Sequence, residues 1–141
     1  ALPALADDSG LCVDALGGAP GILSARFAGP DADDANNNAK LQQALRAHPE
    51  VSPAFYYCVI VFVSHPRDPA PLLATGVWHG RIIRTARGSN GFGYDPYFES
   101  ADTGMTAAEL TPEAKNRISH RGQAVRSLLQ QLQDFPAAAD Q

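Results

Sequence analysis

The 141-residue sequence has few charged residues, few cysteines and no long apolar run. Charged residues make up 18% of it, and 15 acidic side chains outnumber 11 basic ones, which argues against binding to a nucleic-acid polymer. The longest apolar run, residues 54–63, is well short of the ~18 residues that a membrane span needs. The two cysteines, Cys12 and Cys58, form no Cys-x-x-Cys pair, which disfavours a disulfide scaffold or a zinc site. Without a recognisable signal peptide, we expect a cytoplasmic protein with no membrane partner.

Hydrophobic residues make up 45% of the sequence, and a chain of this length can bury ~68–70% of its extended surface. No internal repeat or shift in composition divides it. We therefore expect a single domain over residues 1–141.

The order of the predicted elements indicates an α/β or α+β fold with mixed strand directions. Two short extended pieces around a polar corner at Asp7-Asp8 come first, followed by a helix within residues 31–47. Residues 55–63 are predicted to form a strand covered on both faces, and residues 72–85 one long strand or two consecutive ones. A glycine-rich loop at 88–95 precedes a further strand and two helices, and the tail beyond Pro136 is expected to be loose.

Three helix starts carry capping residues. Asp31 or Asp33 can cap the first helix, Thr111 followed by a proline can cap a short helix through residue 118, and Ser119 can cap the last helix. The last helix should bury an apolar stripe formed by Ala124, Val125, Leu128, Leu129 and Leu132.

Adjacent carboxylates at Asp7 and Asp8 follow an apolar segment, where unpaired charges are costly to bury. One interpretation is a turn in which aspartate caps its own backbone. The other is an oxygen site for Mg²⁺, which takes one or two carboxylates, waters and substrate phosphates. Because side chains alternate along a strand, at most one of the two carboxylates would face a given site.

The loop at residues 88–95 has a Gly-x-x-Gly-x-Gly spacing that is not the dinucleotide-binding fingerprint. Asn90-Gly91 is also typical of a plain hairpin turn. The aromatic residues Phe92 and Tyr94, interleaved with small ones, favour a site for a flat heterocycle. Asp95 could accept hydrogen bonds from ring N–H groups or ribose hydroxyls.

The string Lys115 to Gly122 could be an ordinary basic helix end. Lysine is nevertheless scarce, since Lys40 and Lys115 are the two lysines in the sequence, and His120 and Arg121 stand at a predicted helix N-terminus. Positive side chains oppose the helix dipole there but assist anion binding.

Four segments of the sequence belong together: ADDSGL from residue 6, GGAPGI-x-SAR from residue 17, GFGYDP from residue 91 and ISHRGQA from residue 118. In this order they resemble the motifs of the inosine/xanthosine triphosphate pyrophosphatases, which hydrolyse noncanonical purine nucleotides. The resemblance runs from residue 1 to about residue 132.

The resemblance implies a long twisted mixed sheet with flanking helices and two lobes around a central cleft. It implies cleavage of dITP, ITP or XTP to the monophosphate and pyrophosphate with Mg²⁺ as cofactor, by a cytosolic homodimer. On this basis Asp8 would be the proton acceptor and metal ligand. The substrate-binding residues implied are Ser9, Phe92, Gly93, Tyr94, Asp95, Lys115, His120 and Arg121.

Elementary chemistry agrees with these roles. A carboxylate can orient or deprotonate water while a cation neutralises phosphate oxygens. Donors at Lys115, His120 and Arg121 would favour 6-oxo purines over adenine, whose 6-amino group would leave them unsatisfied.

Two elements of the resembled family are missing from the sequence: an upstream Thr/Ser-x-x-Asn-x-x-Lys phosphate loop and an acidic residue that shares the metal. We therefore expect an N-terminally truncated domain with little or no turnover. The alternatives are a chain that binds nucleotide or dimerises without turnover, and a nucleotide pyrophosphatase of the septum-formation-inhibitor type, which would not account for the Ser-His-Arg-Gly-Gln-Ala string.

Overall fold

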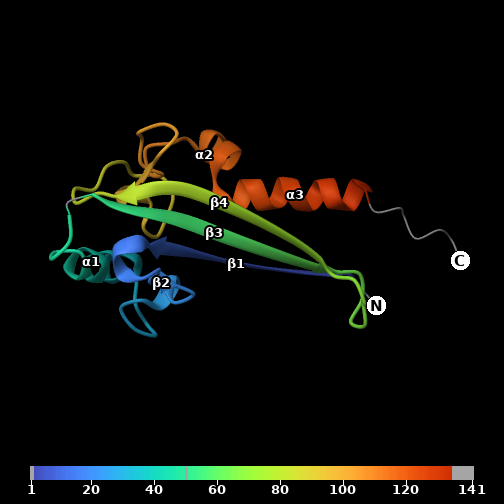
Figure 1. Ribbon diagram of the computed structural model, residues 1–141. Helices are drawn as coiled ribbons and strands as arrows, with labels where there is room; N and C mark the ends of the chain where they lie inside the picture. The colour runs from blue at the N-terminus through green and yellow to red at the C-terminus, as the bar shows by residue number, and fades with distance from the viewer. Residues whose placement is uncertain (1, 50, 135–141) are drawn as a thin grey trace, which may run out of the picture.

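The computed structural model describes residues 2–49 and 51–134, and its centre is a five-stranded sheet in the order β2-β1-β3-β4-β5 (Figure 1). Its long strands are β1 (Ala4–Val13), β3 (Ser52–Val63) and β4 (Leu72–Ile82). The short strands β2 (Pro20–Gly21) and β5 (Phe98–Ser100) lie at the two edges.

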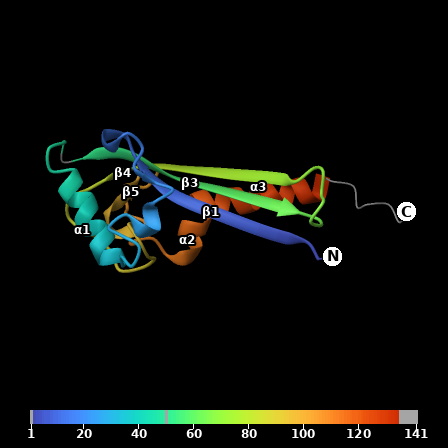
Figure 2. The ribbon, with the colours of Figure 1, turned by 90° about the horizontal axis from the view of Figure 1, so that it is seen from below.

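The sheet is flanked by three helices, α1 (Asp34–Ala44), α2 (Pro112–Ile118) and α3 (His120–Asp134). Figure 2 shows α3 running along the strands on one face of the sheet, with α1 and α2 gathered at one end. The expected fold class, α/β with a long twisted sheet and flanking helices, is confirmed.

Every strand pairing among the described residues is antiparallel, whereas mixed directions were expected. For β3 and β4 the reason is their connection: they are joined by a hairpin over residues 64–71, and a parallel pair would need a longer crossover. In the part of the chain that the structure describes, the C-terminal part of α3 is the helix that covers the far end of the sheet, at this hairpin (Figure 1).

All three predicted caps are present. Asp33 accepts a hydrogen bond from the Asn36 amide at 2.8 Å, and Thr111 accepts one from the Ala114 amide at 3.1 Å. Ser119 Oγ accepts from the Gly122 amide at 3.0 Å. The third cap fixes where α3 begins, and therefore where His120 lies.

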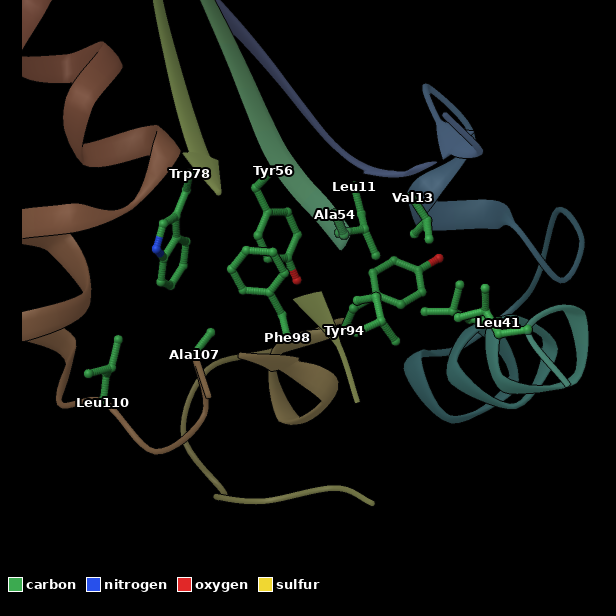
Figure 3. Packing of buried hydrophobic residues seen from close by; sticks show 12 residues of the cluster. Leu11, Val13, Leu41, Ala54, Tyr56, Trp78, Tyr94, Phe98, Ala107 and Leu110 are labelled. Carbon is green, nitrogen blue, oxygen red and sulfur yellow. The ribbon is translucent and has the colours of Figure 1, made fainter. Parts of the chain in front are cut away.

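The core at the helix-bearing end is aromatic (Figure 3). The Tyr56 ring lies 4.5 Å from the Phe98 ring and 6.0 Å from the Trp78 ring, measured between centroids. Leu11, at the same end of β1, is fully buried in this cluster. A second cluster, around Cys58, packs beneath α3.

Three sequence predictions were wrong in detail. β1 is one continuous strand, not two pieces around a corner, because its backbone pairs with β3 from Ala4 to Val13. Burial along β3 alternates, so one face is more exposed than the other. In the apolar stripe of α3, Ala124 and Leu128 are buried while the other three members are exposed. The predicted loose tail lies outside the described residues, and within them no helix could cross a membrane.

Candidate functional site

A cleft of about 460 Å³ lies at the helix-bearing end of the sheet, between α1 on one side and α2 and the start of α3 on the other. The structure brings eight of the predicted site residues to its wall. They are Ser9, Phe92, Gly93, Tyr94, Asp95, Lys115, His120 and Arg121. Asp8, the ninth, is not among the residues that line it.

Asp95 is buried and engaged by groups of the protein itself. Its Oδ2 accepts from Lys115 Nζ at 2.6 Å and from the Phe92 amide at 3.1 Å, while its Oδ1 accepts from the Tyr56 hydroxyl at 3.1 Å. A Cβ at Gly91, whose φ is +75°, would collide with the same carboxylate. Asp95 therefore holds the loop and Lys115 in place, and its direct contact with a ligand stays a prediction.

The two loop aromatics have separate environments. Tyr94 is 5% exposed, and its hydroxyl donates to the Ser24 carbonyl at 2.5 Å. Burial, helped by the Asp34 charge, raises the pKa of Tyr94 to about 12. Phe92 is 67% exposed, with Lys115 Nζ 4.7 Å from its ring centroid. Phe92 is thus the loop ring with a free face for stacking, whereas Tyr94 anchors the loop.

Both backbone polar groups of Gly93 are hydrogen-bonded to side chains of α1. Asp34 Oδ2 accepts from the Gly93 amide at 2.8 Å, and Asn38 Nδ2 donates to the Gly93 carbonyl at 2.9 Å. Asp34 also lines the cleft. The loop conformation is therefore fixed by a helix more than 50 residues away in sequence.

His120 forms part of the cleft wall and packs flat on the aromatic core. Its ring lies 4.7 Å from the Tyr56 ring, with 11° between the planes, and 6.2 Å from the Trp78 ring. Burial, together with the Lys115 and Arg121 charges, lowers the pKa of His120 to about 4. The imidazole is therefore neutral at pH 7, so one of its nitrogens donates and the other accepts.

Two buried polar atoms of the cleft residues lack a hydrogen-bond partner among the described residues: Ser9 Oγ and His120 Nδ1. Such atoms cost free energy unless something satisfies them. Their position on the wall of a cleft indicates that a polar ligand could supply the missing partners.

The two adjacent carboxylates of β1 are divided between the faces of the strand. Asp7 Oδ2 forms an ion pair with Arg121 at 2.9 Å, on the same side as Ser9. Strand alternation places the Asp8 side chain on the opposite face. The sequence predicted that at most one of the two carboxylates would face a given site; the one on the Ser9 side is Asp7, whereas the resemblance implied Asp8 as the site residue.

The Asp8 carboxylate is a suitable type of metal ligand, but it would be a single ligand. Its side chain is exposed and belongs to none of the ion pairs among residues 2–49 and 51–134. No group of three or more His, Cys, Asp or Glu side chains in that part of the chain could hold a metal ion. Mg²⁺ can nevertheless bind through one carboxylate, because waters and substrate phosphates complete its shell.

Several residues that line the cleft were not among the predicted site residues. Tyr56, Ser24, Asp34 and Asn37 also line the cleft. Asn37 is buried. Its side-chain amide donates a hydrogen bond to the Ala25 carbonyl at 3.0 Å and accepts one from the Ala28 backbone amide at 2.8 Å. Three consecutive asparagines inside a helix were the available signal, since asparagine is a poor helix former without such partners.

Comparison with known proteins gives the family. The model of the Ham1 family matches residues 1–131. The dITP/XTP pyrophosphatase of Aromatoleum aromaticum is 56% identical over 96% of this chain, and that of Chromobacterium violaceum is 54% identical over 93%. The chain spans 68% and 66%, respectively, of the lengths of these two relatives.

Solved structures agree with the sequence matches. A HAM1 protein from Coxiella burnetii superposes with a TM-score of 0.90 at 50% identity, covering 95% of this chain and 68% of that one. The Ham1 protein of Staphylococcus aureus superposes with a TM-score of 0.85 at 40% identity, covering 94% and 67%. These matches, and the gathering of four separate motifs around one cleft, establish that the chain belongs to the Ham1 family.

Proposed function

We propose that this chain hydrolyses noncanonical purine nucleoside triphosphates, namely dITP, ITP and XTP, to the monophosphate and pyrophosphate with Mg²⁺. The observation that carries the proposal is the cleft, which gathers eight predicted substrate residues and leaves Ser9 Oγ and His120 Nδ1 unsatisfied. The names of the relatives, dITP/XTP pyrophosphatase, support the same reaction.

The charges around the cleft support a preference for 6-oxo purines. Lys115 and Arg121 are donors, and hypoxanthine and xanthine present an acceptor at position 6 where adenine presents a donor. Neutral His120 can also accept a hydrogen bond, and the N1–H of an oxo purine is a donor that adenine lacks. An adenine would offer the donors Lys115 and Arg121 no acceptor at position 6 and would offer His120 no N1–H donor, and a polar site penalises such mismatches.

Asp8 is proposed as the group that orients and deprotonates the attacking water. Its carboxylate is exposed and not committed to another side chain, whereas that of Asp7 is paired with Arg121. When bound beside Asp8, Mg²⁺ would supply charge neutralisation for the phosphate oxygens. Phe92 would stack on the base, and the Asp95 carboxylate would keep Lys115 directed at it.

The test is pyrophosphate release from dITP in the presence of Mg²⁺, comparing the chain with Asp8→Asn. Hydrolysis should fall by at least about a hundredfold, because removal of a general base typically costs that much. Binding of dITP should change little. The matched control is Asp102→Asn, an exposed aspartate outside the cleft, which should retain turnover. Undiminished turnover in Asp8→Asn would contradict the assignment of the base.

A second candidate is nucleotide binding without turnover. It is favoured by the absence of a three-ligand metal cluster among the described residues and by the position of Asp8 outside the cleft lining. Calorimetry with dITP separates the two proposals, since binding without pyrophosphate release supports the second.

Base selection has its own test in Lys115→Ala. The ratio of dITP to dATP turnover, or of their affinities, should fall about tenfold because a charged donor to the base edge is lost. Lys40→Ala is the matched control, since Lys40 packs on Phe27 outside the cleft. An unchanged ratio in Lys115→Ala would remove Lys115 from base recognition.

We also infer a homodimer and a cytoplasmic location. The exposed apolar side chains of α3, Val125, Leu129 and Leu132, support self-association, since such a stripe is costly to leave in water. Sedimentation of the wild-type chain and of Leu129→Glu would test it: a monomer in both cases contradicts the dimer. The unpaired thiols Cys12 and Cys58 support a reducing compartment.

A further inference from the structure

Tyr56 connects the two halves of the proposed base site. It lies on β3, lines the cleft and is 8% exposed. Its hydroxyl donates a hydrogen bond to Asp95, which also binds Lys115. Its ring stacks on the ring of His120. Figure 3 shows the side chain projecting from β3 between Trp78 and Leu11, with its hydroxyl at the level of Phe98. None of the four sequence motifs includes this residue.

The hydrogen bond from the Tyr56 hydroxyl affects the position of the Lys115 ammonium. The Asp95 carboxylate is 3% exposed, and its Oδ1 has the Tyr56 hydroxyl as its donor among the described residues. Without that donor Oδ1 would be buried and unsatisfied, so the carboxylate would turn or admit water. Since Lys115 Nζ is bound to the other oxygen of the same group at 2.6 Å, any turn of the carboxylate moves the ammonium.

The stacking contact of the Tyr56 ring affects the orientation of the His120 imidazole. With 11° between the planes and 4.7 Å between the centroids, the imidazole is stacked on the phenol. Hydrogen bonds of an imidazole lie in its ring plane, so the Tyr56 ring also fixes the plane in which His120 can meet the edge of a base. The Phe98 ring also packs against the phenol, with 4.5 Å between the ring centroids.

We propose that Tyr56 is a positioning residue that sets the preference for 6-oxo purines, by holding Lys115 through Asp95 and holding the plane of His120 by stacking. This inference rests on the proposed function. It assigns base selection to a residue that acts through its neighbours and donates no hydrogen bond to the base.

The test is the affinity of the whole chain for dITP and dATP, measured by calorimetry in EDTA so that turnover plays no part. Tyr56→Phe keeps the ring and removes the hydroxyl. The ratio of the two affinities should fall about tenfold, as expected for a lost hydrogen bond to a charged group. Tyr57→Phe is the matched control: it makes the same chemical change at the next residue, on the opposite face of β3, where the ring is 38% exposed. The control should leave the ratio unchanged.

Tyr56→Leu removes the ring as well, and it is read by NMR of the His120 ring protons. Stacked on Tyr56 in the wild type, these protons should move downfield in Tyr56→Leu and keep their position in Tyr56→Phe. Should the leucine variant fail to fold, the phenylalanine variant still decides the question.

The outcomes separate the two proposals. A ratio that falls in Tyr56→Phe but not in Tyr57→Phe supports the inference. Equal weakening of dITP and dATP in Tyr56→Phe, or no change, overturns it and leaves the proposed function standing. A wild-type chain that binds neither nucleotide, or binds both equally, overturns the inference together with the preference for oxo purines.

Discussion

Gly76 on β4 determines how closely α3 can approach the sheet. A Cβ built at this position would overlap the backbone carbonyl of His120, well inside the 3.0 Å that real Cβ atoms respect, and would lie 2.9 Å from Gln123 Cβ. Because the obstacle is backbone, no change of rotamer relieves it. Gly76→Ala must therefore displace the start of α3 by about an ångström.

Two losses should follow from this displacement. Overpacking of this kind costs about 1–3 kcal/mol of unfolding free energy. A shift of about 1 Å in a site residue can also cost about a hundredfold in activity. We therefore expect Gly76→Ala to unfold at lower urea concentration and to lose most of its affinity for dITP, because His120 and Arg121 move with the helix start.

The matched control is Gly80→Ala, four residues along the same strand. There the added Cβ would meet the Glu99 carbonyl and Phe98 on β5, not α3. It should cost comparable stability while weakening dITP binding much less. If Gly76→Ala retains wild-type stability and dITP affinity, or if both variants lose affinity equally, the role assigned to the contact between β4 and α3 is refuted.

Two further predictions concern titratable groups. Tyr94→Phe should lower the unfolding free energy by roughly 1–2 kcal/mol, because the Ser24 carbonyl loses its hydrogen bond from the Tyr94 hydroxyl. An ultraviolet titration of this variant should lack the tyrosine whose pKa is raised to about 12. For His120 the pKa is lowered from 6.5 to about 4, chiefly by burial, so the unfolded chain binds this proton more tightly than the folded one. Stability should therefore fall as the pH drops from 6.5 towards 4. His120→Gln should flatten that part of a urea-midpoint profile, and an NMR titration showing His120 with an ordinary pKa would contradict the argument.

The helix starts were predictable because capping is local. Asp33, Thr111 and Ser119 each accept a hydrogen bond from an amide three residues ahead, so the signal and the contact lie within one turn. The four motifs likewise contain seven of the eight predicted residues that line the cleft, and Lys115 stands three residues before the last motif.

The roles of these residues were less predictable, because they depend on partners far away in sequence. Tyr94 and Phe92 stand two positions apart, yet Tyr94 is buried against Ser24 and Phe92 is exposed at the cleft. Asp95 binds Tyr56 and Lys115, which lie 39 and 20 residues away, and the sequence analysis anticipated neither contact. No local pattern specifies which groups the fold brings to a buried carboxylate.

The polar corner expected at residues 7–8 is a second feature that the local sequence did not predict correctly. Two consecutive aspartates suggest a chain turning into water, but this part of β1 is exposed on both faces, so neither carboxylate is buried. The ladder with β3 satisfies the backbone, and polar side chains do not interrupt it.

The continuity of β1 matters for the proposed chemistry. The ion pair of Asp7 and Arg121 is half exposed, with side chains 40% and 53% accessible, so it contributes little stability, about 0–1 kcal/mol. Its effect is positional, since it holds a guanidinium at the wall of the cleft. A turn at this point would bring both carboxylates to one side, where Asp8 would compete for Arg121 and its own charge would be compensated. The extended strand instead sends Asp8 to the other face, free of the arginine. One unbroken strand thereby separates the carboxylate that positions Arg121, proposed to bind the base, from the one proposed to activate water.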